Sequence, residues 1–316
     1  MRFSSYIAKR YLISKSSNNA INIITLIAAI GVVVGAMSLF IVLSGFSGLK
    51  DFSLSFSNIF DADLKVLPKT GKHFKFNPQD ETHLKEIEGI ASYSKIIEER
   101  VFLSFDGKRH IAYIKGVDEN YRQVTQIDST LLVGNWFETT QPHTVIGLNI
   151  SSILSLGLYD YNEALEIYVP KPGNGDILDA SKAFNKKSVL VSGIYQINED
   201  LDGKYVFSNF NLAKSLLVMP ENSVTGIEIK LSPQADEASI IKNVETLFQQ
   251  KVIVKNRIQQ NDTLYKMLNT ENLAVYLIVS LIAAIALFSI AGAIIMMILN
   301  KRKSIITYYN LGATLR

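Results

Sequence analysis

INIITLIAAIGVVVGAMSLFIVL, residues 21–43, contains no charged side chain, and neither does LAVYLIVSLIAAIALFSIAGAIIMMIL, residues 273–299. In a helix that rises about 1.5 Å per residue, the shorter run extends roughly 34 Å, enough to cross a hydrocarbon core of about 30 Å. It is also longer than the apolar part of a cleaved secretory signal, which has roughly 7 to 15 residues. The two runs therefore predict two permanent transmembrane helices, at residues 21–43 and 272–300.

The charged residues are distributed unevenly about these runs. All 29 Asp and Glu residues lie between positions 44 and 271, whereas the two outer flanks carry basic residues and no acidic one. Because basic residues that flank a span are retained in the cytoplasm, we expect cytoplasmic segments at residues 1–20 and 301–316. Residues 44–271 would then form a domain on the far side of the membrane. The net negative charge of that domain argues against a nucleic-acid partner.

Residues that could carry catalysis or bind a cofactor form no recognisable motif. The chain has no cysteine, which excludes disulfides, thiol catalysis and Cys-ligated metals. Thr70-Gly71-Lys72 lacks the first glycine and the final hydroxyl of a phosphate-binding loop, and the 4 histidines lack the HExxH spacing of a zinc site. We therefore expect a protein that is not an enzyme and that binds no cofactor or metal of its own.

Apolar residues continue the first run outward at intervals of three and four. They are Phe46, Leu49, Phe52, Phe56 and Phe60, and a weaker stripe of Ile258, Leu264, Tyr265 and Leu268 precedes the second run. This spacing predicts one apolar helical face, so each span would continue as a helical stalk. A stalk of this kind either transmits movement or packs as an ordinary helix against its own domain, and both interpretations stay open.

Strand and helix patterns recur at the two ends of the central domain. The first end has a strand at 61–67, a helix after Asn77-Pro78, and a hairpin of 96–105 with 109–116 across Asp106-Gly107. The second end has a strand at 224–231, a helix that we expect to begin at Ser232-Pro233, and a strand at 251–258. These patterns predict an α+β subdomain whose sheet brings the two ends of the domain together.

The segment between these ends, at about 117–217, contains short strand patterns separated by turns. We interpret it as a mostly β subdomain inserted into the first one. A loop at 170–187, which contains Pro172-Gly173-Asn174-Gly175, interrupts this segment. A loop of this length is either a protrusion that binds a partner or a solvated connection.

The last residues of the chain resemble a known element. A basic cluster, Lys301-Arg302-Lys303, is followed by a helix pattern with Ile305 and Ile306 and then by Leu311-Gly312-Ala313. This order resembles the coupling element of ABC transporter permeases of the FtsX/MacB class, in which it docks on the ATPase. Members usually carry an acidic residue where Ser304 stands. The resemblance implies that Lys301, Arg302, Lys303, Ile305, Ile306, Leu311 and Gly312 contact a separate cytoplasmic ATPase subunit, which uses ATP and Mg.

Further short pieces resemble lipoprotein-releasing permeases of the LolC/LolE type. They are IAKRYL at 7–12, LSGFSGL at 43–49, VIG at 145–147 with LGL at 156–158, and TGIEIKL at 225–231. The resemblance implies an α+β membrane protein in which two transmembrane helices with extended stalks flank a MacB-like periplasmic core domain. Such permeases are longer and have four spans, so we expect this chain to be a fragment that stops in the coupling element.

The same resemblance implies a transport function without chemistry in this subunit. The protein would lie in the bacterial inner membrane and pair with a second permease subunit as a homodimer or heterodimer. It would take a lipoprotein out of the membrane lipid and pass it to a periplasmic carrier protein, driven by the ATPase subunit.

Two sets of residues would serve this transport. The acyl chains would occupy a cavity lined by Met37, Phe40, Phe46 and Tyr276. A loop of the inserted subdomain would hold the carrier, and its residues here are Pro170, Pro172, Asn174 and Lys182.

Two other functions compete with lipoprotein release. A MacB-like permease would export drugs or peptides through a periplasmic adaptor and an outer-membrane channel, although MacB itself carries a fused ATPase before its first span. A membrane sensor with two spans has the same plan, but it would continue into a long signalling helix and would have no use for Leu311-Gly312-Ala313.

Overall fold

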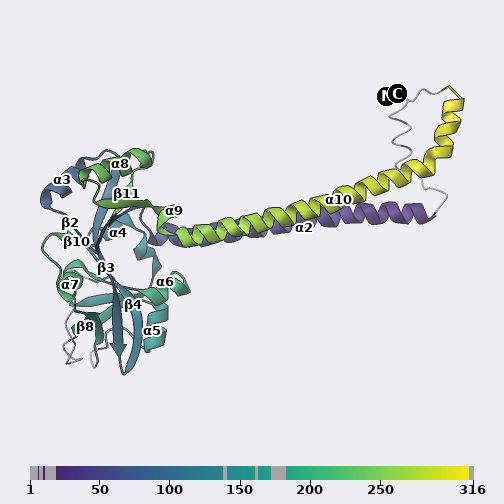
Figure 1. Cartoon of the computed structure of the whole chain (residues 1–316). Coiled ribbons are helices and arrows are strands. Elements are labelled where there is room, and N and C mark those ends of the chain that lie inside the picture. The colour runs from purple at the N-terminus through teal and green to yellow at the C-terminus, as the bar shows by residue number, and fades with distance from the viewer. Residues whose placement is uncertain are drawn as a thin grey trace. The chain divides into compact units, whose positions relative to one another are not determined.

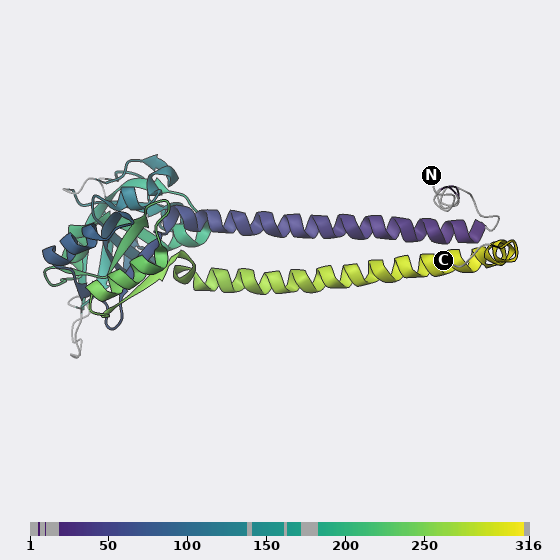
Figure 2. The ribbon, with the colours of Figure 1, turned by 90° about the horizontal axis from the view of Figure 1, so that it is seen from above.

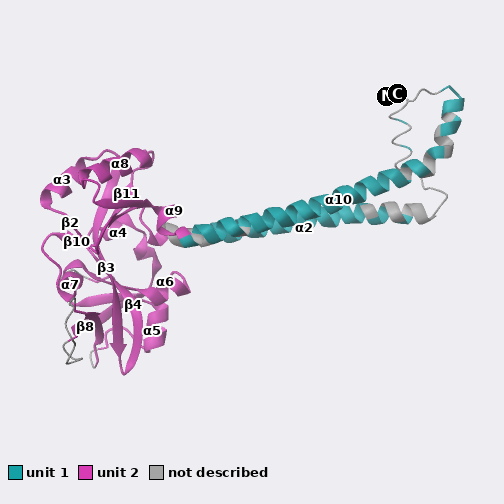
Figure 3. Ribbon diagram, in the orientation of Figure 1, with its two compact units in different colours: residues 1–52, 263–316 teal, residues 53–262 magenta. Residues whose placement is uncertain are grey.

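The computed structural model describes residues 6, 10, 19–137, 141–160, 163–171 and 183–312. The chain divides into two compact units (Figure 3). Residues 1–52 and 263–316 form the helical unit, and residues 53–262 form the sheet unit. Helix α2 (Asn19–Phe60) and helix α10 (Asp262–Asn310) supply almost all described residues of the helical unit.

Helices α2 and α10 run side by side within the helical unit (Figure 2). A Cβ atom added at Gly35 of α2 would lie 3.8 Å from Cγ2 of Ile282 of α10, which is an ordinary van der Waals distance, so the two helices lie close together there. On α10, Leu268 and Val275 are buried, about two helical turns apart. The segments Ala29–Phe52 and Tyr265–Met296 are long and apolar enough to cross a membrane.

The sheet unit is built on one sheet of ten strands among the described residues (Figure 1). Nine strands follow the order β12-β1-β11-β3-β4-β9-β6-β8-β5, and β7 pairs with both β3 and β8. The strands are β1 (Leu64–Pro68), β3 (Ile90–Phe105), β4 (Lys108–Val117), β5 (Leu131–Gly134), β6 (His143–Gly147), β7 (Leu165–Pro170), β8 (Phe184–Tyr195), β9 (Tyr205–Asn209), β11 (Gly226–Leu231) and β12 (Val252–Asn256). Strands β2 (Phe74–Lys75) and β10 (Ser223–Val224) form a separate pair.

Short helices cover both faces of this sheet. They are α3 (Pro78–Glu86), α4 (Tyr121–Val124), the 3-10 helix η1 (Ile127–Thr130), α5 (Leu148–Leu154), α6 (Glu199–Lys204), α7 (Phe210–Leu216), α8 (Glu237–Leu247) and α9 (Arg257–Gln260). On one face, α5 and α7 contribute to one apolar core, and α3 and α8 contribute to another. On the other face, Phe60 at the end of α2 joins residues of α4 and η1 in a third core rich in aromatic rings.

The pairing of the strands confirms two expectations from the sequence. Strand β1 lies between β11 and β12 and is antiparallel to both, so the two ends of the domain do meet in one sheet. Strands β3 and β4 form the expected hairpin, in which Phe105 pairs with Lys108 across Asp106-Gly107. Asp106 and Gly107 have φ of 46° and 70°, as a tight two-residue hairpin turn requires.

The start of α8 differs from the expectation. The sequence predicted a helix from Ser232-Pro233, but α8 begins at Glu237 and Asp236 is its N-cap. The backbone N–H of Ala235 instead donates to the carbonyl of Ser232, which makes a turn. The Asp236 carboxylate then accepts from the N–H of Ala238, so the stronger cap lies after the proline. Helix α3, by contrast, begins at Pro78 after Asn77, as predicted.

Candidate functional site

Four charged side chains form a row across neighbouring strands of the sheet. They are Lys65 on β1, Glu228 on β11, Glu98 on β3 and Lys115 on β4. Lys65 lies opposite Glu228 in the strand register, and Glu98 lies opposite Lys115. Since residues directly opposite each other point to the same face of a sheet, the register brings the four charges together. We call these residues the ion row.

In the ion row each ammonium group contacts at least one carboxylate, and the four side chains are largely buried. The Lys115 ammonium lies 2.8 Å from Glu228 Oε1, and these side chains are 1% and 2% exposed. The Lys65 ammonium lies 2.7 Å from Glu98 Oε2 and 3.6 Å from Glu228 Oε1. Removing charges from water costs several kcal/mol per ion, and only close pairing of this kind offsets that cost. The row is therefore sensitive to any change in the spacing of its strands.

Aromatic rings surround Lys115, the residue of the row that lies on β4. The Lys115 ammonium lies 4.7 Å from the centre of the Phe60 ring and 5.0 Å from that of Tyr121. The Tyr205 hydroxyl donates to Glu98 Oε1 at 3.0 Å, and its ring lies 5.0 Å from the Phe60 ring. Cations are attracted to the faces of such rings, and exclusion of water strengthens the attraction. Phe60, the last residue of α2, thus contacts the ion row directly.

Two groups of the row, Glu98 and Lys65, have pKa values that their charged neighbours shift toward the ionised form. Burial favours the neutral carboxyl of Glu98, but the ammonium groups of Lys65 and Lys115 outweigh burial and lower its pKa to about 2. Burial disfavours the charge on Lys65, yet Glu98 and Glu228 raise the pKa of Lys65 above its ordinary value. Burial, together with the charge of Glu98, raises the pKa of the Tyr205 hydroxyl, so this group stays protonated and donates.

Two buried oxygen atoms in this cluster remain unsatisfied. The Tyr121 hydroxyl and Oε2 of Glu228 have no hydrogen-bond partner among the described residues. A buried polar group left without a partner costs about 1–3 kcal/mol.

A second set of contacts ties the chain after α2 to the chain before α10. Arg257 Nη2 lies 2.8 Å from Asp63 Oδ1, and Asp63 Oδ2 accepts from the N–H of Leu231 at 2.8 Å. The side-chain amide of Gln260 donates to the carbonyl of Ala62 at 3.0 Å. The Asn261 amide donates to Asp61 Oδ2 at 2.6 Å. We call the contacts of Asp63 with Arg257, of Ala62 with Gln260 and of Asp61 with Asn261 the latch, because each joins residues about 200 positions apart in the sequence.

The residues predicted to line a substrate cavity lie on the surface of the helical unit. Met37, Phe40 and Tyr276 are 59%, 72% and 69% exposed, and Phe46 is partly exposed. This chain by itself therefore does not enclose them.

The predicted coupling residues continue helix α10, which ends at Asn310. Arg302, Ile306 and Leu311 are exposed, and Gly312 has φ of 91°, which favours glycine. The backbone of Lys301, Lys303 and Ile305 is helical.

Of the four predicted carrier-binding residues, Pro170 is the one that the structure describes. It is exposed and ends β7. Pro172, Asn174 and Lys182 lie outside the described residues.

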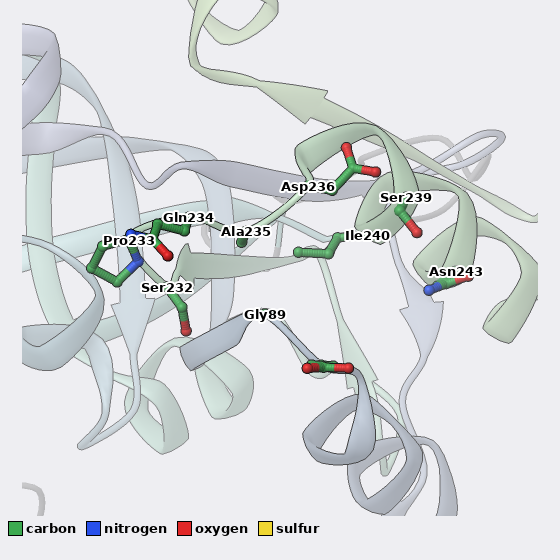
Figure 4. A pocket seen from close by; sticks show the side chains of 10 residues that line it. Gly89, Ser232, Pro233, Gln234, Ala235, Asp236, Ser239, Ile240 and Asn243 are labelled. Atoms are coloured by element: carbon green, nitrogen blue, oxygen red, sulfur yellow. The ribbon is translucent and has the colours of Figure 1, made fainter.

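Several hollows lined by described residues of the sheet unit bring no catalytic grouping together. One, of about 620 Å³, lies beside the start of α8 and is lined by the loop from Ser232 to Asp236 and by Gly89 (Figure 4). Glu88 and Asp236 are among its lining residues, and the Asp236 carboxylate already accepts from the N–H of Ala238 as the N-cap of α8. No cluster of His, Cys, Asp or Glu suited to a metal occurs in the part of the chain that the structure describes.

Residues 25–247 match the family described as MacB-like periplasmic core domain, which covers more than half of the sequence. The chain belongs to this MacB-like family. The resemblance to ABC transporter permeases that the terminal and internal motifs predicted is thereby confirmed.

Curated relatives extend the likeness beyond the core domain. The chain is 22% identical over 324 aligned positions to the lipoprotein-releasing system transmembrane protein LolE of Haemophilus influenzae, covering 98% of this chain and 74% of that protein. It is 20% identical over 315 positions to LolC of Neisseria meningitidis serogroup B, with the same coverage. Among solved structures, the periplasmic region of MacB from Actinobacillus actinomycetemcomitans matches with a TM-score of 0.45 and 14% identity, covering 64% of this chain and 92% of that one.

The ion row of this MacB-like chain is the functional candidate that sequence patterns missed. Lys65, Glu98 and Lys115 each lie inside a strand pattern, where a charged residue is ordinarily assigned to the solvent face. Glu228 offered one signal, since it stands between Ile227 and Ile229 in a strand that is buried on both faces. Nothing in the sequence indicated which lysine it meets, because strand order is a tertiary property.

Proposed function

We propose that this chain is the permease subunit of an ABC transporter that extracts lipoproteins from the bacterial inner membrane and passes them to a periplasmic carrier protein. The observation that carries the proposal is the likeness to LolE and LolC over 98% of the chain, which includes both long helices as well as the core domain. The subunit performs no chemistry. A separate cytoplasmic ATPase subunit binds ATP and Mg and supplies the energy.

In this proposal, α2 and α10 cross the membrane and the sheet unit lies in the periplasm. The length and composition of the two apolar segments support this topology. So do the basic residues of the outer flanks, since such residues are retained on the cytoplasmic side. The proposed coupling element, with Lys301, Arg302, Lys303, Ile305, Ile306, Leu311 and Gly312, then lies where a cytoplasmic ATPase can bind it.

Movement of the membrane helices reaches the sheet through the ion row and the latch. Phe60 contacts Lys115 and Tyr205, so a displacement of the end of α2 changes the packing around a buried charge. The latch between Asp63 and Arg257 makes the two chain ends of the sheet unit move together. Closely packed side chains with paired charges, such as those of the ion row and the latch, transmit a displacement because they have few alternative arrangements.

The cargo and carrier sites require partners. Met37, Phe40, Phe46 and Tyr276 line the acyl-chain cavity once a second permease subunit and membrane lipid surround them, which fits their exposure in the single chain. The loop with Pro170, Pro172, Asn174 and Lys182 holds the carrier.

A second candidate is a MacB-like efflux permease for drugs or peptides, which the family match to residues 25–247 favours. The two functions differ in their partners. Lipoprotein release requires an acylated protein and a soluble carrier, whereas efflux requires a periplasmic adaptor and an outer-membrane channel.

Copurification tests the proposal. The chain, expressed in its own host and extracted in detergent, is expected to retain an ABC ATPase subunit and an acylated protein that mass spectrometry identifies by its lipid. Recovery of an adaptor and no acylated protein would favour efflux instead, and recovery of neither partner would contradict both.

A matched pair of variants tests the transmission step. Arg257→Gln removes the ion pair of the latch, and we expect it to reduce lipoprotein release while ATPase binding is retained. Arg122→Gln removes an exposed ion pair with Asp128, which belongs to neither the ion row nor the latch, and serves as the control. Equal release by the two variants would contradict a role for the latch.

A further inference from the structure

One edge of β3 is left without a partner strand along part of its length. On that edge, β11 pairs with residues of β3 up to Ile96, and β7 pairs with Phe102, Leu103 and Ser104. Neither ladder covers residues 97–101, and no other strand of the described residues pairs with them there. We call this stretch the open edge.

The open edge has a defined set of main-chain groups. The carbonyl of Ile96 accepts from the N–H of Thr225, and the N–H of Glu98 donates to the Thr225 hydroxyl at 2.6 Å. Even-numbered residues of this strand therefore direct their N–H and C=O groups toward the open edge, since these groups alternate along a strand. The carbonyls of Glu98 and Arg100 and the N–H of Arg100 face the gap.

Proline explains why β7 does not close the gap. The register that pairs Phe102 with Tyr168 would next pair Arg100 with Pro170 through hydrogen bonds. Pro170 has no N–H, so it cannot donate to the carbonyl of Arg100. The Arg100 N–H donates to Oε1 of the adjacent Glu99 at 3.3 Å, a long hydrogen bond that a partner strand could replace.

A groove of about 900 Å³ lies over the open edge. Its lining includes Arg100 and Lys171, which are exposed, and the apolar side chains of Phe102, Phe184 and Val218, which are 39%, 41% and 69% exposed. Lys72 also lines the groove, but Glu99 pairs with it at 3.0 Å. The groove thus offers strand-pairing groups, apolar contacts and an excess of positive charge.

We propose that the open edge binds an extended acidic segment of a partner protein, which adds to the sheet as a short strand between β11 and β7. Main-chain groups of β3 supply the affinity, as in other cases of strand addition. Arg100 and Lys171 select acidic side chains, and the exposed rings accommodate apolar ones. This site lies within the sheet unit and does not depend on lipoprotein release.

A synthetic peptide of alternating valine and aspartate, labelled with a fluorophore, tests the proposal on the full chain in detergent. Its alternation places all aspartates on one face of a strand. We expect fluorescence anisotropy to show binding, and we expect the same peptide with lysine in place of aspartate to bind at least tenfold more weakly. Failure of the acidic peptide to bind at millimolar concentration, or equal binding of the two peptides, would overturn the proposal.

Methylated peptides distinguish strand addition from simple charge attraction. One peptide carries N-methyl groups on every valine nitrogen and the other on every aspartate nitrogen. Only alternate N–H groups of an added strand face β3, so one peptide is expected to lose binding at least tenfold while the other retains it. Equal affinity of the two would overturn strand addition.

A charge reversal locates the site. Arg100→Glu is expected to weaken binding of the acidic peptide at least tenfold and to improve binding of the lysine peptide. Arg109→Glu, an exposed arginine of β4 outside the groove lining, is the matched control and should change neither affinity more than twofold. The same effect in both variants would overturn the assignment to the open edge.

Discussion

The Lys115 ammonium lies 4.7 Å from the centre of the Phe60 ring. This contact joins the last residue of a 42-residue helix to a lysine that is 1% exposed in the middle of the sheet. A charge so completely removed from water depends on its immediate neighbours, which for Lys115 are Glu228 and the surrounding rings. The end of α2 is therefore part of the environment that keeps this charge stable.

Removal of the carboxylate partner of Lys115 is expected to destabilise the sheet unit strongly. Glu228→Leu should lower the free energy of unfolding by about 3–5 kcal/mol, because it leaves a buried ammonium without its nearest carboxylate. Adding Lys115→Met should restore most of this loss, since no buried charge then remains unpaired. Urea unfolding of the chain in detergent measures both values.

Arg122→Met is the control for this pair, since the Arg122 side chain and its partner Asp128 are 53% and 44% exposed. It should cost less than about 1 kcal/mol. A double variant no more stable than Glu228→Leu alone would contradict the assigned pairing.

Loss of the Phe60 ring should also be costly. Phe60 is 4% exposed, and Phe60→Ala is expected to lower the free energy of unfolding by about 3–5 kcal/mol through the cavity and the lost ring contacts. Phe288→Ala changes a ring that is 79% exposed and should cost less than about 0.5 kcal/mol in detergent. Similar losses in these two variants would show that Phe60 does not pack as described.

Acid should weaken the ion row through Glu98. The pKa of Glu98 is about 2 in the folded protein, below the ordinary value of 4.5. A lowered folded-state pKa contributes stability that is fully present above the unfolded-state pKa and is lost as the pH falls from about 4.5 to about 2. Unfolding temperatures measured across this range should fall more steeply for the unmodified chain than for Glu98→Gln. Parallel profiles would mean that another carboxylate dominates the acid response.

Two glycines from the motifs that resemble lipoprotein-releasing permeases should differ sharply in their tolerance of substitution by alanine. A Cβ at Gly147 would lie 2.1 Å from the backbone oxygen of Asp202, whereas nothing lies within 4 Å of a Cβ at Gly157. Gly147→Ala should therefore cost several kcal/mol, because backbone atoms must shift, and Gly157→Ala should cost less than about 0.5 kcal/mol. Thermal unfolding of the two variants provides the comparison, and equal stability would contradict the close approach at Gly147.

Local features of the sequence predicted many elements correctly. The hairpin of β3 and β4 follows from Asp106-Gly107 between alternating apolar residues, and α3 follows from Asn77-Pro78. The predicted start of α8 was wrong because the sequence offers two N-terminal signals, Ser232-Pro233 and Asp236. The chain forms a turn at Ser232, and Asp236 is the N-cap of the helix. Signals within a few residues of each other decide such boundaries only when they agree.

The amino-acid sequence by itself determined the two long apolar helices, the uneven charge distribution and most strands, because each depends on residues close together in the chain. Only the tertiary structure decided that Lys65, Glu98, Lys115 and Glu228 form one largely buried row and that residues 97–101 of β3 have no partner strand among the described residues on the edge opposite β4. Both features depend on which distant strands become neighbours, and that choice is made by burial of the whole sheet between its helices and the aromatic core.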